Sequence, residues 1–195
     1  MLYNIAKNIL KIFVYIVFNI KTHNVDALNN SKGRIILCSN HISMIDPIVL
    51  AVSSKRKIHY MGKKELFKNK LLGYIFTKLG AFPVDREGVS LSAIKNSLAV
   101  LNNNEILGIF PEGTRVREYN EDNAKPGIAL IAKKAGSDII PVYIEGPYKF
   151  RGKINIYFGE EKNYHSEYTG KMTTENYAEI GKEILKDIYN LRKDR

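Results

Sequence analysis

The stretch RIILCSNHISMIDPIVLAV, residues 34–52, joins one apolar run to another through a short polar turn. The first run is rich in aliphatic residues, as is typical of a buried strand in an α/β protein. An acid followed by proline is a typical helix start, so we expect Asp46 at the N-cap and Pro47 at the first helical position. The stretch therefore predicts a buried strand, a turn that presents His41, and a helix beginning at Asp46.

Strand-like and helical patterns alternate along the rest of the chain. We expect further strands at 57–62, 81–85, 106–110, 139–146 and 153–160, and helices at 68–80, 90–103, 126–136 and 173–193. This alternation predicts an α/β fold with a mostly parallel, mixed sheet flanked by helices, in which the last two strands add an antiparallel portion. A length of 195 residues suits a single domain.

The N-terminal residues 1–24 are apolar except for a narrow stripe at helical spacing, which predicts an amphipathic helix. The longest uncharged run, Ile12–Ile20, has nine residues, whereas a membrane-spanning helix needs about 20. The helix either packs on its own domain or lies in a membrane interface with its apolar side chains buried in lipid. We therefore divide the chain into a membrane-associating helical element, 1–30, and a main domain, 31–195.

The formal net charge is +10, and much of it is concentrated between Lys55 and Lys78. That segment holds eight basic residues against one acid, Glu65. The excess indicates either an ordinary solvated face or an anionic partner: lipid headgroups, an acidic carrier protein or nucleic acid. The single cysteine, Cys38, excludes an internal disulfide and a cysteine-cluster zinc site.

Three polar clusters follow predicted strands, at the sheet edge where α/β proteins gather their ligands. The first contains His41 and Asp46, whose spacing of five residues does not place them on one helix face. If His41 lies in the turn before the helix, the Asp46 carboxylate can reach back to its Nδ1 and leave Nε2 as a general base. The alternative is that Asp46 only caps the helix and His41 is a loop residue.

A base of this kind needs a hydroxyl or thiol to deprotonate. Cys38 would permit a Cys–His acyl-enzyme, but its position at the end of an apolar strand favours core packing. Ser43 has no nucleophile-elbow pattern around it. A hydroxyl on the substrate is the better candidate.

The other two clusters place Arg86 and Arg115 beyond strand ends. A guanidinium group matches the geometry of phosphate, and a charge-assisted hydrogen bond contributes about 1.5–3 kcal/mol. Gly113 permits close approach of the backbone to a ligand, Thr114 offers a hydroxyl, and Glu112 can accept from a ligand hydroxyl. The alternative is that the arginines form salt bridges with Asp85 and Glu112 and shape the loop.

Taken together, four ordered blocks resemble the glycerolipid acyltransferases, a family that includes the 1-acyl-glycerol-3-phosphate acyltransferases. The blocks are NHISMID at 40–46, GAFPVDR at 80–86, FPEGTR at 110–115 and IIPVYI at 139–144. A histidine and an aspartate at this spacing recur by chance, but four blocks in order are specific. The resemblance covers residues 33–146.

The resemblance implies acyl transfer from a thioester of coenzyme A or acyl carrier protein to the free hydroxyl of a lysophosphatidate, giving phosphatidic acid. It implies that His41 is the base and that Asp46 orients it, without an acyl-enzyme, metal or prosthetic group. Arg86, Glu112, Gly113 and Arg115 match the acceptor-binding positions, to which we add Thr114. Lys63 is at a position where relatives often carry a lysine.

The resemblance also implies an enzyme on the cytoplasmic face of the membrane, peripheral or monotopic, that contacts an anionic lipid surface. Within this class, glycerol 3-phosphate or another lysophospholipid is an alternative acceptor. An alternative of another class is a non-catalytic basic module that binds membrane or nucleic acid. We expect no nucleic-acid partner, because the basic segment contains no recognisable binding motif.

Overall fold

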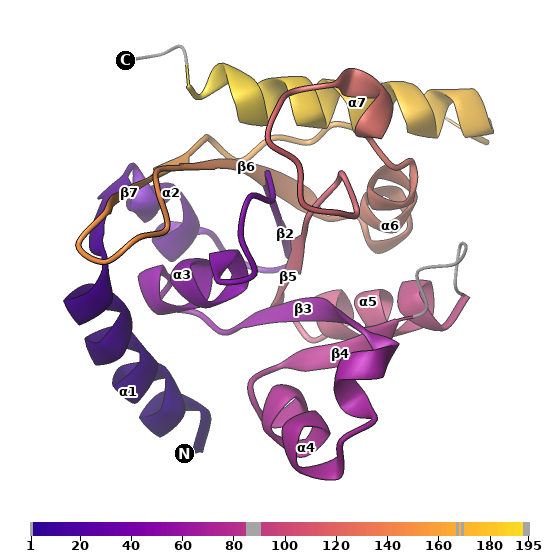
Figure 1. The fold of residues 1–195 in the computed structure, drawn as a ribbon. Helices are drawn as coiled ribbons and strands as arrows, with labels where there is room; N and C mark the ends of the chain where they lie inside the picture. Colours follow the sequence, from indigo (N-terminus) through magenta and orange to yellow (C-terminus); the bar gives the residue numbers. More distant parts are fainter. Residues whose placement is uncertain (1, 85–90, 167, 169, 193–195) are drawn as a thin grey trace.

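The computed structural model describes residues 2–84, 91–166, 168 and 170–192 (Figure 1). The strands are β1 (Asn19–His23), β2 (Ile35–Ser39), β3 (Ile58–Lys63), β4 (Ala81–Val84), β5 (Ile106–Ile109), β6 (Asp138–Glu145) and β7 (Lys153–Phe158). The α-helices are α1 (Leu2–Val17), α2 (Val25–Asn30), α3 (Asp46–Ser53), α4 (Lys70–Lys78), α5 (Leu91–Asn102), α6 (Gly127–Ala135) and α7 (Thr174–Asn190). Two 3₁₀ helices, η1 (Lys64–Phe67) and η2 (Glu121–Asn123), complete the elements of this part of the chain.

The seven strands form one sheet in the order β1-β7-β6-β2-β5-β3-β4. Strands β2 to β6 run parallel to one another. Strand β7 is antiparallel to β6 and parallel to β1, so these two strands form the reversed edge of the sheet. The predicted α/β class with a mostly parallel, mixed sheet is therefore confirmed.

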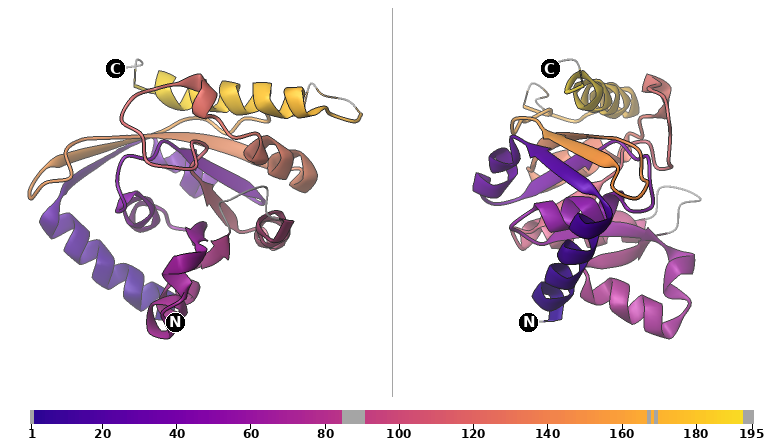
Figure 2. Two further views of the ribbon diagram at one scale, coloured as in Figure 1. Left: turned by 45° about the vertical axis from the view of Figure 1, so that its right-hand side comes forward. Right: turned by 60° about the vertical axis from the view of Figure 1, so that its left-hand side comes forward.

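Strand β2 lies at the centre of the sheet and is buried on both faces. Ile35 and Leu37 belong to the core beneath α1 and α3, whereas Ile36 and Cys38 belong to the core beneath α5, α6 and α7. Figure 2 shows α7 on one side of the sheet and α1 and α3 on the other. Burying one large aliphatic side chain stabilises the fold by about 1.5–3 kcal/mol, so β2 gives the residues that follow it a rigid support.

The N-terminal segment differs in part from the sequence-based expectation. Helix α1 ends at Val17, and residues 19–23 form the edge strand β1 instead of continuing the helix. One side of α1 packs into the core through Val14, while Ile9 and Ile12 are more than 60% exposed. The predicted packing on the domain is therefore observed for one face of the helix, and contact of the other face with a membrane interface stays a prediction. The division of the chain at residue 30 stays a prediction.

No helix among the described residues combines the length and the apolar character that a membrane crossing requires.

Candidate active site

Asn40 fixes the turn that follows β2. Its side-chain Oδ1 accepts a hydrogen bond from the backbone N–H of Ile144 at 2.7 Å, and its Nδ2 donates to the carbonyl oxygen of Ile144 at 2.9 Å. Asn40 is 1% exposed, so these bonds are shielded from water. The first and fourth sequence blocks are thus held together at the carboxyl end of the sheet.

His41 and Asp46 form the predicted pair. His41 Nδ1 lies 2.8 Å from Asp46 Oδ2, and the same oxygen accepts hydrogen bonds from the backbone N–H groups of Ile42 and Ser43, both at 2.7 Å. The expected cap is wrong by one residue, because Ile45 occupies the N-cap and Asp46 is the first helical residue. The carboxylate therefore holds the preceding turn, not the first turn of α3.

Tyr148, in the connection between β6 and β7, supports the same carboxylate. Its hydroxyl donates a hydrogen bond to Asp46 Oδ1. Burial of the hydroxyl, followed by the nearby charge of Asp46, raises the pKa of Tyr148, so the group stays protonated and acts as a donor. Sequence analysis missed this residue, because nothing in the spacing connects positions 102 residues apart.

The donors around Asp46 determine the tautomer of His41. An ionised carboxylate only accepts hydrogen bonds, so the tautomer of the neutral imidazole that fits this contact has its proton on Nδ1 and its lone pair on Nε2. The imidazole stacks on Phe110 with ring centroids 4.2 Å apart, and its side chain is 13% exposed. This geometry suits a general base with one accessible nitrogen.

Glu112 lies behind the pair. Its Oε2 accepts from the backbone N–H of His41 at 3.2 Å, and its Oε1 accepts from the hydroxyl of Tyr189, in α7, at 2.9 Å. Glu112 is 2% exposed, and burial raises the pKa of its carboxyl group. The observed contacts make Glu112 a positioning residue for His41; its contact with substrate stays a prediction. Tyr189, like Tyr148, was missed by sequence analysis.

The loop after β5 turns sharply and returns to His41. Gly113 has φ +69°, which favours glycine, and its N–H donates to the carbonyl oxygen of Phe110 at 3.0 Å. The backbone N–H of Val116 then donates to the carbonyl oxygen of His41 at 2.9 Å. Together with Glu112, the loop therefore holds the backbone of His41 at both its N–H and its carbonyl group.

Two of the three predicted cationic residues, Arg115 and Lys63, are among the described residues. Arg115 is exposed, and no carboxylate within the described residues forms an ion pair with it, so the proposed Glu112–Arg115 pair is not found there. Thr114 is exposed beside it. Lys63 is exposed at the carboxyl end of β3, in register with Val84 at the end of β4. Arg86 lies outside the described residues.

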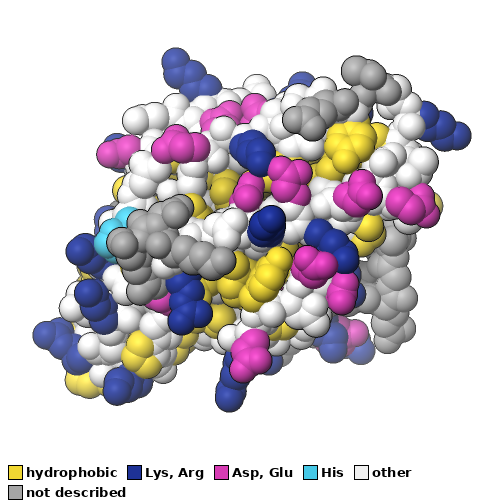
Figure 3. Space-filling model, turned by 90° about the horizontal axis from the view of Figure 1, so that it is seen from above, with side chains coloured by type: hydrophobic (Ala, Val, Ile, Leu, Met, Phe, Trp, Pro, Cys, Tyr) yellow, Lys and Arg dark blue, Asp and Glu magenta, His cyan; other side chains and the backbone are white. Residues whose placement is uncertain are grey.

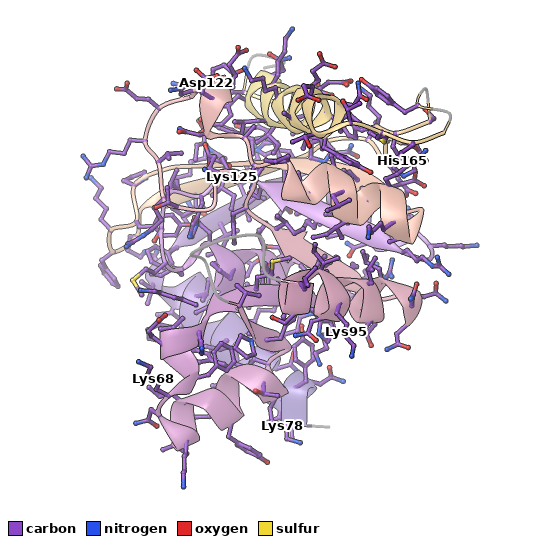
Figure 4. All side chains as sticks on the ribbon, turned by 90° about the vertical axis from the view of Figure 1, so that its right-hand side faces the viewer. Lys68, Lys78, Lys95, Asp122, Lys125 and His165 are labelled. Atoms are coloured by element: carbon purple, nitrogen blue, oxygen red, sulfur yellow. The ribbon has the colours of Figure 1, made fainter. Side chains whose placement is uncertain are left out.

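One further cation borders the loop. Lys125 is exposed, and its Cε lies 3.8 Å from the position that a Cβ on Gly113 would occupy. Figure 4 labels Lys125 on the segment that leads into α6. Nothing in the sequence distinguishes Lys125 from the chain's many other lysines.

Of the two candidate protein nucleophiles, Cys38 is poorly placed to react. Cys38 is fully buried, and burial raises the pKa of its thiol well above the ordinary value, which disfavours the reactive thiolate. Ser43 uses its hydroxyl oxygen to accept from the backbone N–H of Ile45 at 3.3 Å. The expected core role of Cys38 is confirmed.

Replacing Tyr148 by phenylalanine tests the support of Asp46. Tyr148→Phe is expected to lower the free energy of unfolding by about 1.5–3 kcal/mol, because it removes a hydrogen bond to a fully buried charge. The matched control is Tyr164→Phe, which removes a bond of 2.8 Å to Asp187, a side chain that is 31% exposed. Water can replace that bond, so we expect Tyr164→Phe to lower the free energy of unfolding, measured with urea, clearly less than Tyr148→Phe does. Equal decreases would contradict the proposed support of Asp46 by Tyr148.

Glu112→Gln tests the cost of burying the Glu112 carboxylate. Because its folded-state pKa is raised, the native protein holds this proton more tightly than the unfolded chain does. The protonated carboxyl group therefore stabilises the folded state. This contribution to the free energy of unfolding is fully present below the pKa of the unfolded chain, about 4.3, and is lost as the pH rises through the pKa of the folded protein. Glutamine does not titrate, so the unfolding free energy of the wild type relative to the variant should fall over this window. A rise, measured by urea unfolding at several pH values, would contradict the prediction.

Comparison with known proteins identifies relatives of this chain. The Acyltransferase family model matches residues 19–145. A 1-acyl-sn-glycerol-3-phosphate acyltransferase of Bacillus subtilis is 36% identical over 165 residues, which cover 82% of this chain and 81% of the relative. One of Streptococcus pneumoniae is 40% identical over 139 residues, covering 70% of this chain and 51% of the relative.

The fold has a counterpart among solved structures. The crystal structure of the 1-acyl-sn-glycerophosphate acyltransferase of Thermotoga maritima matches with a TM-score of 0.69 and covers 99% of this chain and 82% of that chain. At 19% identity, this likeness shows a shared fold. From the family model and the sequence relatives, the chain belongs to the acyltransferase family.

Proposed function

We propose that the protein transfers an acyl chain from a thioester to the free hydroxyl of 1-acyl-glycerol-3-phosphate, giving phosphatidic acid. The observation that carries the proposal is the His41–Asp46 pair, with Nε2 available, on a turn whose carbonyl oxygen at His41 accepts a hydrogen bond from the backbone N–H of Val116, the neighbour in sequence of the exposed Arg115. The names of the relatives from Bacillus subtilis and Streptococcus pneumoniae support the same acceptor.

In the proposed reaction, His41 Nε2 takes the proton of the acceptor hydroxyl as its oxygen attacks the thioester carbonyl. Asp46 stabilises the imidazolium that forms, and general-base catalysis of this kind contributes about 10²–10⁴ in rate. The new C–O bond replaces the C–S bond, and His41 returns the proton to the departing thiolate. A thioester is already activated, so the proposal needs no metal, prosthetic group or acyl-enzyme.

We assign the acceptor phosphate to the cationic residues around the loop. Arg115, together with Lys63 and Arg86, supplies charge, and Gly113 and Thr114 supply backbone and hydroxyl contacts. Glu112 remains the candidate for the glycerol hydroxyl, although the observed bonds use its oxygens within the protein.

The acceptor is a lipid, so we further propose that the enzyme works as a peripheral protein on the cytoplasmic face of the membrane. The exposed apolar face of α1 supports contact with a bilayer interface. The donor is a thioester of coenzyme A or of acyl carrier protein, and assays with each distinguish the two.

His41→Ala is expected to lower turnover by at least about a hundredfold, because it removes the general base. The assay uses purified protein, an acyl thioester and lysophosphatidate. Cys38→Ala is the matched control and should retain turnover. The mechanism would be contradicted by wild-type-like turnover in His41→Ala. It would also be contradicted by an acyl adduct that mass spectrometry finds on the wild type but not on Cys38→Ala.

Arg115→Gln is expected to raise the KM for lysophosphatidate by roughly tenfold or more, since a charge-assisted bond contributes about 1.5–3 kcal/mol. The KM for the thioester should change little. Arg117→Gln serves as control, because Arg117 is exposed just beyond the FPEGTR block. Assays with glycerol 3-phosphate and other lysophospholipids test the alternative acceptors; faster turnover of one of these would replace lysophosphatidate in the proposal.

A further inference from the structure

Exposed apolar side chains are concentrated in two places. Of the fifteen large hydrophobic side chains that are exposed among the described residues, six belong to α1 and five to the η1–α4 segment, residues 64–78. The five, which we call the η1–α4 face, are Leu66, Leu71, Leu72, Tyr74 and Ile75, with exposed fractions between 41% and 69%. Such a patch on a water-soluble surface indicates a binding function.

The inner side of this segment is already filled, which explains why these side chains stay outside. Gly73 is buried, and a Cβ there would lie only 2.8 Å from the carbonyl oxygen of Phe67. Phe67 in turn contacts Phe76, with ring centroids 5.9 Å apart. Helix α4 therefore packs closely on η1 through Gly73 and the two phenylalanines, and the η1–α4 face points away from that contact.

Lysines are interleaved with the apolar side chains of the same segment. The exposed lysines are Lys63, Lys64, Lys68, Lys70 and Lys78, against the single acid Glu65. Other basic residues of the basic stretch identified in the sequence have internal partners: Arg56 donates to the carbonyl oxygens of Gly33 and Asn104, both at 2.7 Å, and Lys57 lies over the ring of Tyr3. Lys63 pairs with Glu65 at 3.7 Å and Lys78 lies over the ring of Tyr74, but both lysines are exposed, so the positive charge of the segment remains open to a partner at the η1–α4 face.

We propose that the η1–α4 face binds an anionic lipid leaflet, with its apolar side chains in the interface and its lysines at the headgroups. The apolar side chains favour lipid over an acidic carrier protein, because pairing with acidic groups would use the lysines and leave the leucines in water. This inference deepens the proposed function, on which it rests for its biological purpose. Its physical basis, however, is independent of catalysis.

The position of the segment agrees with the proposal. Helices α1 and α4 lie at the same end of the molecule, remote from α7 (Figures 1 and 2). Figure 4 labels Lys68 and Lys78 around α4 at this end. The opposite end, seen in Figure 3, carries acidic and basic side chains intermixed, which suits an anionic surface less well. Lys63, the N-cap of η1, would then hold the acceptor phosphate beside the leaflet.

A tryptophan reporter tests the proposal directly, because the chain contains no tryptophan. In Leu71→Trp, we expect the emission to shift to shorter wavelength, and quenching by aqueous iodide to fall, on addition of vesicles of phosphatidylcholine and phosphatidylglycerol. Lys186→Trp, on the exposed face of α7 at the other end, is the matched control and should show neither change. If only α1 entered the bilayer, the Leu71→Trp signal would also stay unchanged, which would overturn the proposal.

A second measurement tests the lysines. Lys68→Gln combined with Lys70→Gln should weaken binding to the anionic vesicles roughly tenfold or more, since each lysine near such a surface contributes about fivefold. Lys134→Gln combined with Lys186→Gln removes the same charge from exposed sites on α6 and α7 and should leave binding nearly unchanged. Equal weakening by the two pairs would contradict the proposal.

The carrier-protein alternative has its own outcome. If acyl carrier protein without vesicles shifts the emission of Leu71→Trp, and vesicles do not, the face is a carrier-protein site and the lipid proposal fails. None of these measurements needs turnover, so a failure of the proposed reaction and a failure of the lipid-binding proposal remain distinguishable.

Discussion

The site depends on one buried anion. The Asp46 carboxylate is 0% exposed, and it receives hydrogen bonds from two backbone N–H groups, a tyrosine hydroxyl and the imidazole of His41. A charge without such partners would cost several kcal/mol in this environment. The fold therefore has to bring these donors together, and in doing so it fixes the turn, the tautomer and the direction of the histidine. Catalytic geometry and stability are two consequences of the same set of bonds.

The sheet makes this arrangement rigid. Strand β2 has neighbours on both edges and helices on both faces, so its carboxyl end has little freedom. Asn40 then joins that end to β6, while Glu112 and Val116 hold the backbone of His41 from the β5 side. The first, third and fourth sequence blocks, which lie far apart along the chain, meet because parallel strands place their carboxyl ends at one edge.

Sequence patterns predicted the structural features that depend on local chemistry and on the spacing of apolar residues. The strands and helices from residue 34 onward and the His41–Asp46 pair follow from apolar spacing, proline and glycine positions, and a histidine close to an acid. Strand β1 was missed, since its sequence NIKTH continues a helical stripe and becomes a strand only through pairing with β7. Tyr148 and Tyr189 were missed because their partners are 102 and 77 residues away, and only tertiary folding brings them together.

The N-terminal helix is part of this support and is not simply an appended anchor. The carbonyl oxygen of Val17, at the end of α1, accepts from the backbone N–H of Arg151 at 2.7 Å, and the ring of Phe18 meets Tyr148 edge-on with centroids 5.5 Å apart. Tyr148 in turn donates to Asp46. A helix with an exposed apolar face is thus connected through two aromatic rings to the carboxylate that orients His41. Displacement of α1 would remove the packing that holds the Tyr148 hydroxyl, so the helix contributes to the site even though it contains none of its predicted residues.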